Sequence, residues 1–544
     1  MNCRESYRKW MESPHINSED KRKLQSMNDD EIYEAFYKNI EFGTAGMRGK
    51  MGLGTNRINK YTIRMASRAL AAILGKGAKA AIAYDTRNGS KEFALESARV
   101  LGAYGVNVLL FDRFSPVPLL SYIIREYGCD GGAVITASHN SKEYNGFKTY
   151  GSSGVQMAPD MTERISRIIG SMKDPLDIKM CSSDSHMITY IGRKAAEKFE
   201  KAVIGCSLLR EGESKKNLRV VYTPLYGSGK DYVKNILEAD GFINLKLVEK
   251  QCNFNGDFPG LVKPNPELPE VFSEAEKEAE KFDADLIIGT DPDSDRVGVG
   301  VRCGKGYKYL TGNQTGALLV DFICRMKKGR RRTLVTTVVT GELGSDIAKK
   351  NGCRVLKTLT GSKYVCDRLD MLTDEQFLLG YEESYGYVAG RHVRDKDGVS
   401  AAMLICEMAA YLKEYDMTLV DRLSELYEEF GYYADGQDSI SYEGAKGADE
   451  IERIMEDLRY HGAEYFKNTG DISEIIDFKE GEHGLPPSNL MKFVFDNGSW
   501  VSARPSGTEP NIKIYYCMKG SDAENAQKRL DTARCEVKRA FECI

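Results

Sequence analysis

A recurring local pattern constrains the fold of this chain more than any other sequence feature. A buried-strand sequence, a glycine-containing loop, a helical stretch and a second glycine follow one another three times. The three strands begin near Ala80, Leu218 and Thr333. This order is typical of βαβ units, in which strands of a mixed or parallel sheet alternate with helices. The pattern therefore predicts three similar mixed α/β domains.

The C-terminal part of the chain carries a different pattern. Residues 493–495 and 513–517 alternate like strands, and residues 523–541 are expected to form a last helix. We therefore expect a fourth domain of the α+β type, and the length of 544 residues suits three or four domains. The expected domains, the first with a helical N-terminal extension, cover residues 1–200, 201–315, 316–430 and 431–544.

Charge and composition argue against several classes of protein. The net charge is -4, which does not suit a protein built to neutralise nucleic-acid phosphates. No run of about 18 apolar residues occurs, so no membrane span is expected. The thirteen scattered cysteines form no C-x-x-C pair, which indicates reduced thiols in a cytoplasmic protein. A locally basic cleft for a small anion stays compatible with this composition.

A polar T-x-S-H-N cluster follows a buried strand at residues 133–135. Its serine is Ser138, His139 comes directly after it, and Lys148 lies close in sequence. Ligands of α/β sheets gather at the carboxyl ends of strands, so Ser138 can present its hydroxyl to a substrate. Taken alone, the loop is better interpreted as a helix cap or turn. The G-x-S-x-G pattern of a serine hydrolase is absent.

Three aspartates alternate after a second buried strand. They are Asp291, Asp293 and Asp295, with Arg296 directly after them. Three neighbouring carboxylates repel one another, and a hard divalent cation with oxygen ligands removes that cost. The EF-hand pattern fails because arginines stand where its glycine and glutamate belong. A solvated acidic turn is the alternative. We expect Mg²⁺ bound together with a phosphate, to which Arg296 adds positive charge.

Three later loops carry groups that suit a sugar phosphate. Glu382 and Ser384 lie between glycines and suit hydrogen bonds to sugar hydroxyls. His392 and Lys396 belong to a charged loop that suits acid/base chemistry or phosphate binding. The segment 504–511, R-P-S-G-T-E-P-N, can hold phosphate through its arginine, hydroxyls and backbone N–H groups. Taken singly, these loops could also be an acidic turn, a solvated charge run and a hairpin loop.

Together and in this order, the loops resemble the active-site signatures of the α-D-phosphohexomutase superfamily. The signatures are T-A-S-H-N, D-P-D-S-D-R, G-Y-E-E-S-Y-G (with one tyrosine inserted) and R-P-S-G-T-E-P-N, each in a different domain. F-G-T-A-G-M-R-G and Y-D-T-R-N-G-S also look like this family, and the likeness extends from about Phe42 to the C-terminus. It implies three similar α/β domains and a C-terminal α+β domain around a central active-site cleft. One departure is Ser141, where many relatives have proline.

The resemblance also implies a role for each matching residue. Ser138 matches the serine that carries a phosphoryl group, and the loop at Arg504 matches the one that binds the phosphate that is not transferred. The implied residues are Ser138, His139, Lys148, Arg48, His392 and Lys396 for catalysis; Glu382, Ser384, Arg504, Ser506, Gly507, Thr508 and Arg296 for the substrate; and Ser138, Asp291, Asp293 and Asp295 for the metal. The general base stays open between Lys148 and the His392 region.

The activity implied by the resemblance is a phosphohexomutase that interconverts glucose 1-phosphate and glucose 6-phosphate. Phosphoserine and a bisphosphorylated sugar are the implied intermediates, with Mg²⁺ as cofactor and glucose 1,6-bisphosphate as intermediate and activator. The sugar loop resembles the glucose type, with phosphomannomutase or phosphopentomutase as alternatives. A Mg²⁺-dependent sugar phosphatase or an inactive sugar-phosphate-binding protein would represent other classes. The expected partner is a small-molecule sugar phosphate, without nucleic acid or membrane, for a cytoplasmic monomer or homodimer.

Overall fold

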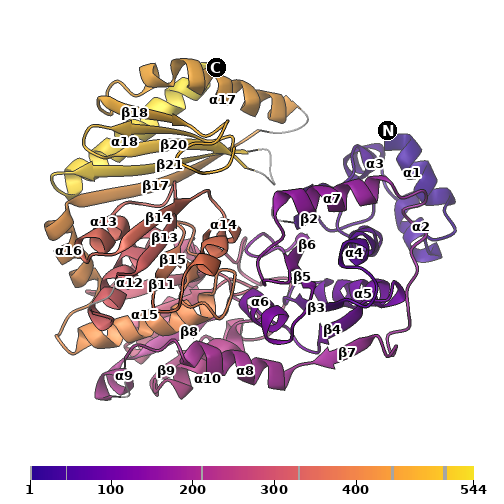
Figure 1. Cartoon of the computed structure of the whole chain (residues 1–544), viewed down its shortest axis with the longest axis horizontal. Coiled ribbons are helices and arrows are strands. Elements are labelled where there is room, and N and C mark those ends of the chain that lie inside the picture. Colours follow the sequence, from indigo (N-terminus) through magenta and orange to yellow (C-terminus); the bar gives the residue numbers. More distant parts are fainter. Residues whose placement is uncertain are drawn as a thin grey trace. The chain divides into compact units, whose positions relative to one another are not determined.

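The chain folds into two compact units. The computed structural model describes residues 3–43, 46–209, 212–328, 331–442, 446–506 and 511–543. Unit 1 consists of Met1–Tyr309 and Gly386–Ala410, and unit 2 consists of Leu310–Tyr385 and Tyr411–Ile544. The segment Gly386–Ala410 thus belongs to unit 1, although the chain on either side of it belongs to unit 2. Figure 1 labels the elements of both units.

The first sheet of unit 1 has seven strands in the order β1-β2-β6-β5-β3-β4-β7. β3 pairs in parallel with β4 and β5, whereas β6 runs antiparallel to β5 and β2. Their bounds are β1 (Phe42–Gly43), β2 (Gly46–Lys50), β3 (Lys79–Tyr84), β4 (Asn107–Phe111), β5 (Gly131–Ile135), β6 (Tyr144–Gly151) and β7 (Ile188–Ile191). The helices are α4 (Lys60–Leu74), α5 (Ser90–Ala103), α6 (Val117–Glu126), α7 (Pro159–Gly170) and α8 (Arg193–Ile204).

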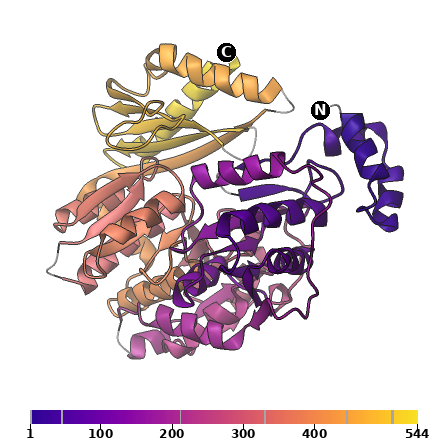
Figure 2. The ribbon, with the colours of Figure 1, turned by 45° about the vertical axis from the view of Figure 1, so that its right-hand side comes forward.

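Three short helices precede this sheet. They are α1 (Cys3–Glu12), α2 (Ser18–Gln25) and α3 (Asp29–Phe36), drawn in indigo in Figure 2. Trp10 packs edge-on against Phe36 and Tyr61, the latter on α4. This aromatic cluster attaches the helical N-terminal extension to the first α/β layer.

The second sheet of unit 1 has five strands in the order β12-β11-β10-β8-β9. β8 lies parallel to β9 and β10, and β10 forms an antiparallel hairpin with β11. The strands are β8 (Val220–Thr223), β9 (Leu245–Leu247), β10 (Leu286–Thr290), β11 (Val297–Cys303) and β12 (Gly306–Leu310). The associated helices are α9 (Glu213–Asn217), α10 (Lys230–Ala239), α11 (Ser273–Phe282), and the 3₁₀ turns η1 (Glu249–Gln251) and η2 (Pro269–Phe272). The segment Gly386–Ala410, which also belongs to unit 1, contains β16 (Tyr387–Val388), which is not a strand of this sheet, and most of α15 (Gly398–Lys413).

Unit 2 begins with a third α/β layer. Its strands β14, β13 and β15 lie side by side in that order, and all are parallel. They are β13 (Thr333–Thr337), β14 (Arg354–Thr358) and β15 (Phe377–Tyr381). The helices are α12 (Gly312–Met326), α13 (Leu343–Lys350), α14 (Ser362–Asp367), η3 (Arg368–Met371) and α16 (Leu419–Phe430). The β13 strand is buried along its whole length, as is usual for a parallel sheet covered by helices on both faces.

The last part of unit 2 is an antiparallel sheet of five strands in the order β17-β21-β20-β19-β18. They are β17 (Tyr432–Ser441), β18 (Ile472–Asp477), β19 (Met491–Phe495), β20 (Trp500–Pro505) and β21 (Asn511–Gly520). Helices α17 (Lys446–Tyr465) and α18 (Ala523–Cys543) pack on one face of this sheet, as Figures 1 and 2 show.

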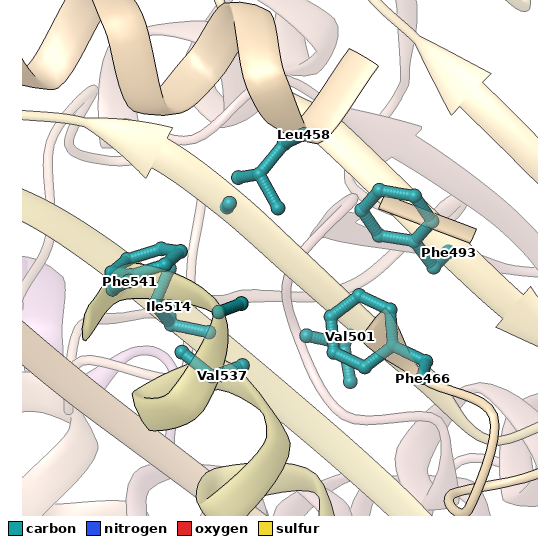
Figure 3. A pocket seen from close by; sticks show the side chains of 9 residues that line it. Leu458, Phe466, Phe493, Val501, Ile514, Val537 and Phe541 are labelled. Atoms are coloured by element: carbon teal, nitrogen blue, oxygen red, sulfur yellow. The ribbon is translucent and has the colours of Figure 1, made fainter. Parts of the chain in front are cut away.

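A small apolar void of about 10 Å³ lies between these helices and the sheet. In Figure 3, the side chains of Leu458, Phe466 and Phe493 surround it. Its lining is entirely apolar, so it belongs to the core of this layer and offers no polar group to a ligand.

The expected fold class is confirmed: three mixed α/β layers precede a C-terminal α+β layer. Within the described ranges, no helix combines the length and apolar character needed to cross a membrane.

Candidate active site

Ser138 stands at the end of β5 in a strained backbone conformation. Its φ of 53° lies in the left-handed region, which non-glycine residues rarely adopt outside turns and functional sites. The backbone N–H of Ser138 donates to Thr136 Oγ1 at 2.8 Å. Its hydroxyl donates to Asp291 Oδ2 at 2.8 Å and lies 3.1 Å from His139 Nδ1. The strained turn thus directs the hydroxyl at a carboxylate 153 positions further along the chain.

The three aspartates lie at the turn between β10 and β11. Asp291, Asp293 and Asp295 are almost completely buried, and one oxygen of each lies within 4.8 Å of the others. In the described part of the chain, Asp293 Oδ1 and Asp295 Oδ1 have no hydrogen-bond partner. A buried carboxylate oxygen without a partner is costly, and a hard cation that prefers oxygen ligands satisfies it. The donor set therefore fits a divalent metal ion.

Two lysines lie against these carboxylates. Lys148 Nζ is 2.9 Å from Asp293 Oδ2, and Lys396 Nζ is 3.2 Å from Asp295 Oδ2. Burial and the charges of Asp293 and Asp295 raise the pKa of Asp291 well above its usual range. Burial also opposes ionisation of Asp293, but the Lys148 ammonium and the hydrogen bond from Asp291 hold its pKa below the ordinary value. Of these two carboxyls, Asp291 is therefore the one that is more readily protonated.

Arg87, in the loop after β3, binds the backbone of the turn that contains Ser138. Its guanidinium is fully buried and donates to four backbone carbonyls of that turn. The acceptors are the carbonyl oxygens of Ser138 at 2.6 Å, Ser141 at 2.8 Å, Tyr144 at 3.2 Å, and Asn140. The sequence interpretation assigned no role to Arg87. The available signal was a D-T-R-N-G-S loop directly after a buried strand.

Asp85, two residues before Arg87, connects the turn at Ser138 to the three aspartates. It accepts hydrogen bonds from Thr136 Oγ1 at 2.6 Å and from the backbone N–H of Arg87 at 3.0 Å. Burial raises the pKa of Asp85, while the charge of Arg87 opposes that rise. Thr136 Oγ1 also lies 3.1 Å from Asp293 Oδ2. The Thr136 hydroxyl therefore contacts both Asp85, which lies next to the turn at Ser138, and Asp293 in the carboxylate cluster.

Two further predicted residues lie beside the turn at Ser138 (the serine turn) and the turn that carries Asp291, Asp293 and Asp295 (the acidic turn). Arg48 on β2 donates from Nη1 to Asn140 Oδ1 at 3.0 Å. Arg296 pairs with Glu267, and its backbone N–H donates to Asp291 Oδ1 at 3.1 Å. Arg48 thus contacts the serine turn, and Arg296 closes the acidic turn.

A close approach between strands allows Lys148 to reach this site. At Gly146 on β6, an added Cβ would lie 2.6 Å from the carbonyl oxygen of Met47 and 2.7 Å from that of Thr136. Because any side chain there would collide with both backbones, the strands could not approach as closely. The glycine therefore helps to hold β6, with Lys148 on it, against the end of β5.

The charged loop at residues 391–397 packs onto unit 1. Tyr150, on β6, donates its hydroxyl to Asp395 Oδ2 at 2.8 Å. Arg125 donates to the carbonyl oxygens of Arg391 at 2.7 Å and His392 at 2.9 Å. These bonds hold the loop in the position from which its Lys396 side chain reaches Asp295.

The His392 side chain contacts Asp397 and Cys206. Its Nε2 lies 3.1 Å from Asp397 Oδ2 and its Nδ1 lies 3.5 Å from Cys206 Sγ. Burial disfavours the imidazolium, but the hydrogen bonds to Asp397 and Cys206, together with the charges of these two groups, outweigh it and raise the pKa of His392 to about 9. Asp397 in turn accepts from backbone N–H groups in the first turn of α15. Within the described part of the chain, the His392 ring makes no contact with Ser138 or with the three aspartates.

Unit 2 carries the remaining predicted residues. Glu382, after β15, is buried and accepts from the backbone N–H of Gly361 at 2.8 Å, and Ser384 is half-buried. Burial and the neighbouring charge of Glu382 raise the pKa of Glu383 to about 7.

The phosphate loop predicted at the end of β20 is described only in part. Arg504 lies on β20, and the backbone N–H of Ser506 donates to the carbonyl oxygen of Asn511 at 2.8 Å. The predicted residues Gly507 and Thr508 lie outside the described residues.

Comparison with known families covers most of the chain. Models of the three alpha/beta/alpha domains of phosphoglucomutase/phosphomannomutase match residues 39–175, 197–304 and 311–430. The model of the C-terminal domain of the same family matches residues 442–534. The chain belongs to the phosphoglucomutase/phosphomannomutase family. The resemblance expected from the four loops is thereby confirmed.

Individual relatives agree with this assignment. The phosphoglucomutase of Staphylococcus aureus strain MRSA252 is 34% identical over 528 residues, covering 93% of this chain and 94% of that protein. A crystal structure of pp63/parafusin from Paramecium has a TM-score of 0.71 at 19% identity and covers 93% of this chain and 95% of that one. A putative phosphomannomutase from Thermus thermophilus has a TM-score of 0.68 at 20% identity, with 92% and 99% covered. At these identities, the two structures show the shared fold.

As a member of this family, the chain is a phosphohexomutase, an isomerase that transfers a phosphoryl group within a sugar phosphate. The family's chemistry needs a phosphoryl carrier and charge stabilisation more than a covalent attack on carbon. The turn at Ser138, the buried aspartates and the two lysines of unit 1 bring a hydroxyl, carboxylates and ammonium groups together.

Proposed function

We propose that this phosphohexomutase interconverts glucose 1-phosphate and glucose 6-phosphate, with Ser138 as the phosphoryl carrier. The hydrogen bond from Ser138 Oγ to Asp291 Oδ2, 2.8 Å long and inside a cluster of buried carboxylates, is the observation that carries the proposal. Glucose as the sugar is supported by a relative of 34% identity over nearly the whole chain that is named phosphoglucomutase.

The proposed cofactor is Mg²⁺, held by Asp291, Asp293 and Asp295 together with the phosphate on Ser138. The buried and unpartnered Oδ1 atoms of Asp293 and Asp295 support oxygen ligation of a hard cation. When bound, such an ion neutralises charge on the phosphoryl group. Lys148 and Lys396 add positive charge at the same place, which suits a group that carries two negative charges.

In the first transfer, a free hydroxyl of the sugar monophosphate forms a bond to the phosphorus of phosphorylated Ser138. The bond from phosphorus to Ser138 Oγ breaks, and the released oxygen takes up a proton. His139 supplies that proton in our proposal, because its Nδ1 lies 3.1 Å from the oxygen. The proton of the sugar hydroxyl passes to a basic group at the aspartates; Lys148 and Lys396 are the candidates, and the one that accepts the proton is a neutral amine at that step while the other keeps its charge.

The product of this step is glucose 1,6-bisphosphate. It turns so that its other phosphate faces Ser138, and the reverse transfer restores the phosphoserine. Glu382 and Ser384 are proposed to bind the sugar hydroxyls in both orientations. Arg504 and Ser506, with Gly507 and Thr508, are proposed to bind the phosphate that is not transferred, because a guanidinium and hydroxyl groups suit that ligand.

A substitution and a mass measurement test the role of Ser138. The protein as purified should carry one phosphoryl group on Ser138. Ser138→Ala should lower kcat about 10³-fold or more, with the fold retained, because the carrier oxygen is gone. Ser141→Ala, in the same turn, serves as the matched control and should keep most of the activity. Full turnover by Ser138→Ala would refute the carrier role.

A comparison of substrates tests the sugar. Coupled assays with the 1-phosphates of glucose, mannose and ribose should give the highest kcat/KM for glucose. A chelator should abolish the activity, and added Mg²⁺ should restore it. Release of inorganic phosphate without isomerisation would instead favour a sugar phosphatase. The proposal also includes a cytoplasmic location, which the free cysteines support, and a monomeric or homodimeric state.

A further inference from the structure

Two cysteines of unit 2 lie in contact at the end of its parallel sheet. Cys324 is in the last turn of α12 and is buried, with 9% of its surface exposed. Cys353 lies between α13 and β14 and is half-buried. Their Sγ atoms are 3.9 Å apart, and both are free thiols. A disulfide needs about 2.05 Å, so the two sulfurs must come about 2 Å closer to form one.

The surroundings of Cys353 favour its thiolate. It lines an open surface depression together with Arg331, Arg332, Lys349 and Arg354, and no acidic side chain is among the described lining residues. Arg332 is mostly buried, and its Nε has no hydrogen-bond partner among the described residues. Thiolates are stabilised by nearby cations, and reactive cysteines occur in partly exposed, positively charged places of this kind.

The two thiols also differ from each other. The contact with Cys324 is the main cause that lowers the pKa of Cys353 to about 6, with burial opposing it and the Arg332 backbone N–H and charge assisting. The same contact, together with burial, raises the pKa of Cys324. Cys353 therefore has the character of an attacking thiolate, and Cys324 remains a protonated thiol beside it.

We propose that Cys353 and Cys324 form a peroxide-reactive pair that closes to an intramolecular disulfide. The Cys353 thiolate attacks one oxygen of a hydroperoxide, the O–O bond breaks, and Cys353 becomes a sulfenic acid while hydroxide or alkoxide leaves. Cys324 then loses its proton and attacks the Cys353 sulfur, expelling the hydroxyl group as water. The two sulfurs together lose two electrons, which reduce the peroxide. A dithiol reductant reverses the change.

This pair is separate from the phosphohexomutase residues of unit 2. Thr333 and Arg354 mark the amino ends of β13 and β14, and Cys353 directly precedes the second of these strands. Glu382 follows the carboxyl end of β15, which is parallel to β13. The thiol pair therefore lies at the amino ends of the parallel strands, and the proposed sugar loop lies at their carboxyl ends. Serine variants of the two cysteines should accordingly keep the basal mutase activity.

The test exposes the reduced, full-length protein to about one equivalent of hydrogen peroxide, blocks the remaining thiols, and maps the cysteines by mass spectrometry without reduction. The expected product is a cross-linked peptide that joins Cys324 to Cys353. Cys129 is buried, and burial raises its pKa to about 11, so it should react at least ~10-fold more slowly. Cys129→Ser, as the matched control, should leave the cross-link unchanged.

The single variants separate the two roles. Cys324→Ser should stop the reaction at a sulfenic acid on Cys353, which dimedone traps. Cys353→Ser should abolish both the cross-link and the dimedone adduct. The proposal is overturned if the wild-type protein oxidises at other cysteines while Cys353 stays reduced. It is equally overturned if Cys324 oxidises as fast in Cys353→Ser. Neither result depends on the sugar or on the mutase activity.

Discussion

The buried guanidinium of Arg87 offers the sharpest test of how the serine turn is held. We predict that Arg87→Met destabilises unit 1 and also displaces Ser138. In the structure, this guanidinium donates to four carbonyl oxygens of the turn and lies 3.3 Å from Asp85 Oδ2. Methionine fills a similar volume but donates no hydrogen bond. The substitution therefore leaves four buried carbonyl oxygens without this donor and the buried Asp85 carboxylate without its cation, although Asp85 keeps its hydrogen bonds from Thr136 and the backbone.

The expected magnitude follows from these contacts. One hydrogen bond to a charged group contributes about 1.5–3 kcal/mol, but such bonds are not additive, and burying the arginine charge has its own cost. Removing one partner of a buried ion pair costs about 3–5 kcal/mol. We therefore expect Arg87→Met to lower the free energy of unfolding of unit 1 by about 4 kcal/mol, which is about 10³ in the equilibrium constant. Asp85→Asn in the same chain should recover about 1–2 kcal/mol, since the unpaired charge is then removed.

The chain has two tryptophans, one in each unit, so tryptophan fluorescence can report the unfolding of unit 1 alone. Trp10 belongs to unit 1 and Trp500 to unit 2. In a Trp500→Phe background, fluorescence during urea unfolding reports on Trp10 alone, whose ring lies 5.4 Å from that of Tyr61 on α4. The change in midpoint multiplied by the m-value gives the loss of stability.

Activity provides the second measurement for Arg87. Because the turn directs Ser138, kcat should fall about 100-fold or more at a temperature where Arg87→Met is still folded, while KM changes little. Arg87→Lys should rescue little, since a compact ammonium cannot reach four carbonyls at once. A loss of stability below about 1 kcal/mol, together with near-normal kcat, would refute the reasoning.

Two further predictions concern charges near the site. Because the folded state raises the pKa of His392 from 6.5 to about 9, the His392–Asp397 pair stabilises the fold fully below about pH 6.5, and that stability is lost as the pH rises through about 9. It amounts to about 3 kcal/mol at most, so His392→Gln should flatten the pH dependence of urea unfolding over this range; an unchanged slope would contradict the assignment. Lys148→Met removes a positive charge 2.9 Å from Asp293, so calorimetry should show tighter Mg²⁺ binding although kcat falls, whereas exposed Lys142→Met should change neither. Weaker Mg²⁺ binding by Lys148→Met would contradict this reasoning.

Much of the fold could be predicted because burial leaves a local trace in the sequence. The strands expected to begin near residues 80, 218 and 333 are β3, β8 and β13, and the last predicted helix is α18. Their apolar runs and flanking glycines report on burial and turns over a few residues. The antiparallel strand β6 was not assigned because its sequence contains glycine, asparagine and lysine, whose places depend on close contacts with other strands.

The candidate site likewise combines residues that the sequence predicts with contacts that only the tertiary structure decides. The sequence by itself predicted which residues carry the chemistry, since Ser138 and the three aspartates each follow a buried strand and have the motif spacing. Only the tertiary structure decided that the Ser138 hydroxyl meets Asp291, that Arg87 holds the turn, and that Lys396 reaches Asp295 while His392 turns to Asp397. The physical reason is that spacing along a chain records local backbone geometry, whereas pairing between distant segments follows from how whole layers pack and bury their polar groups.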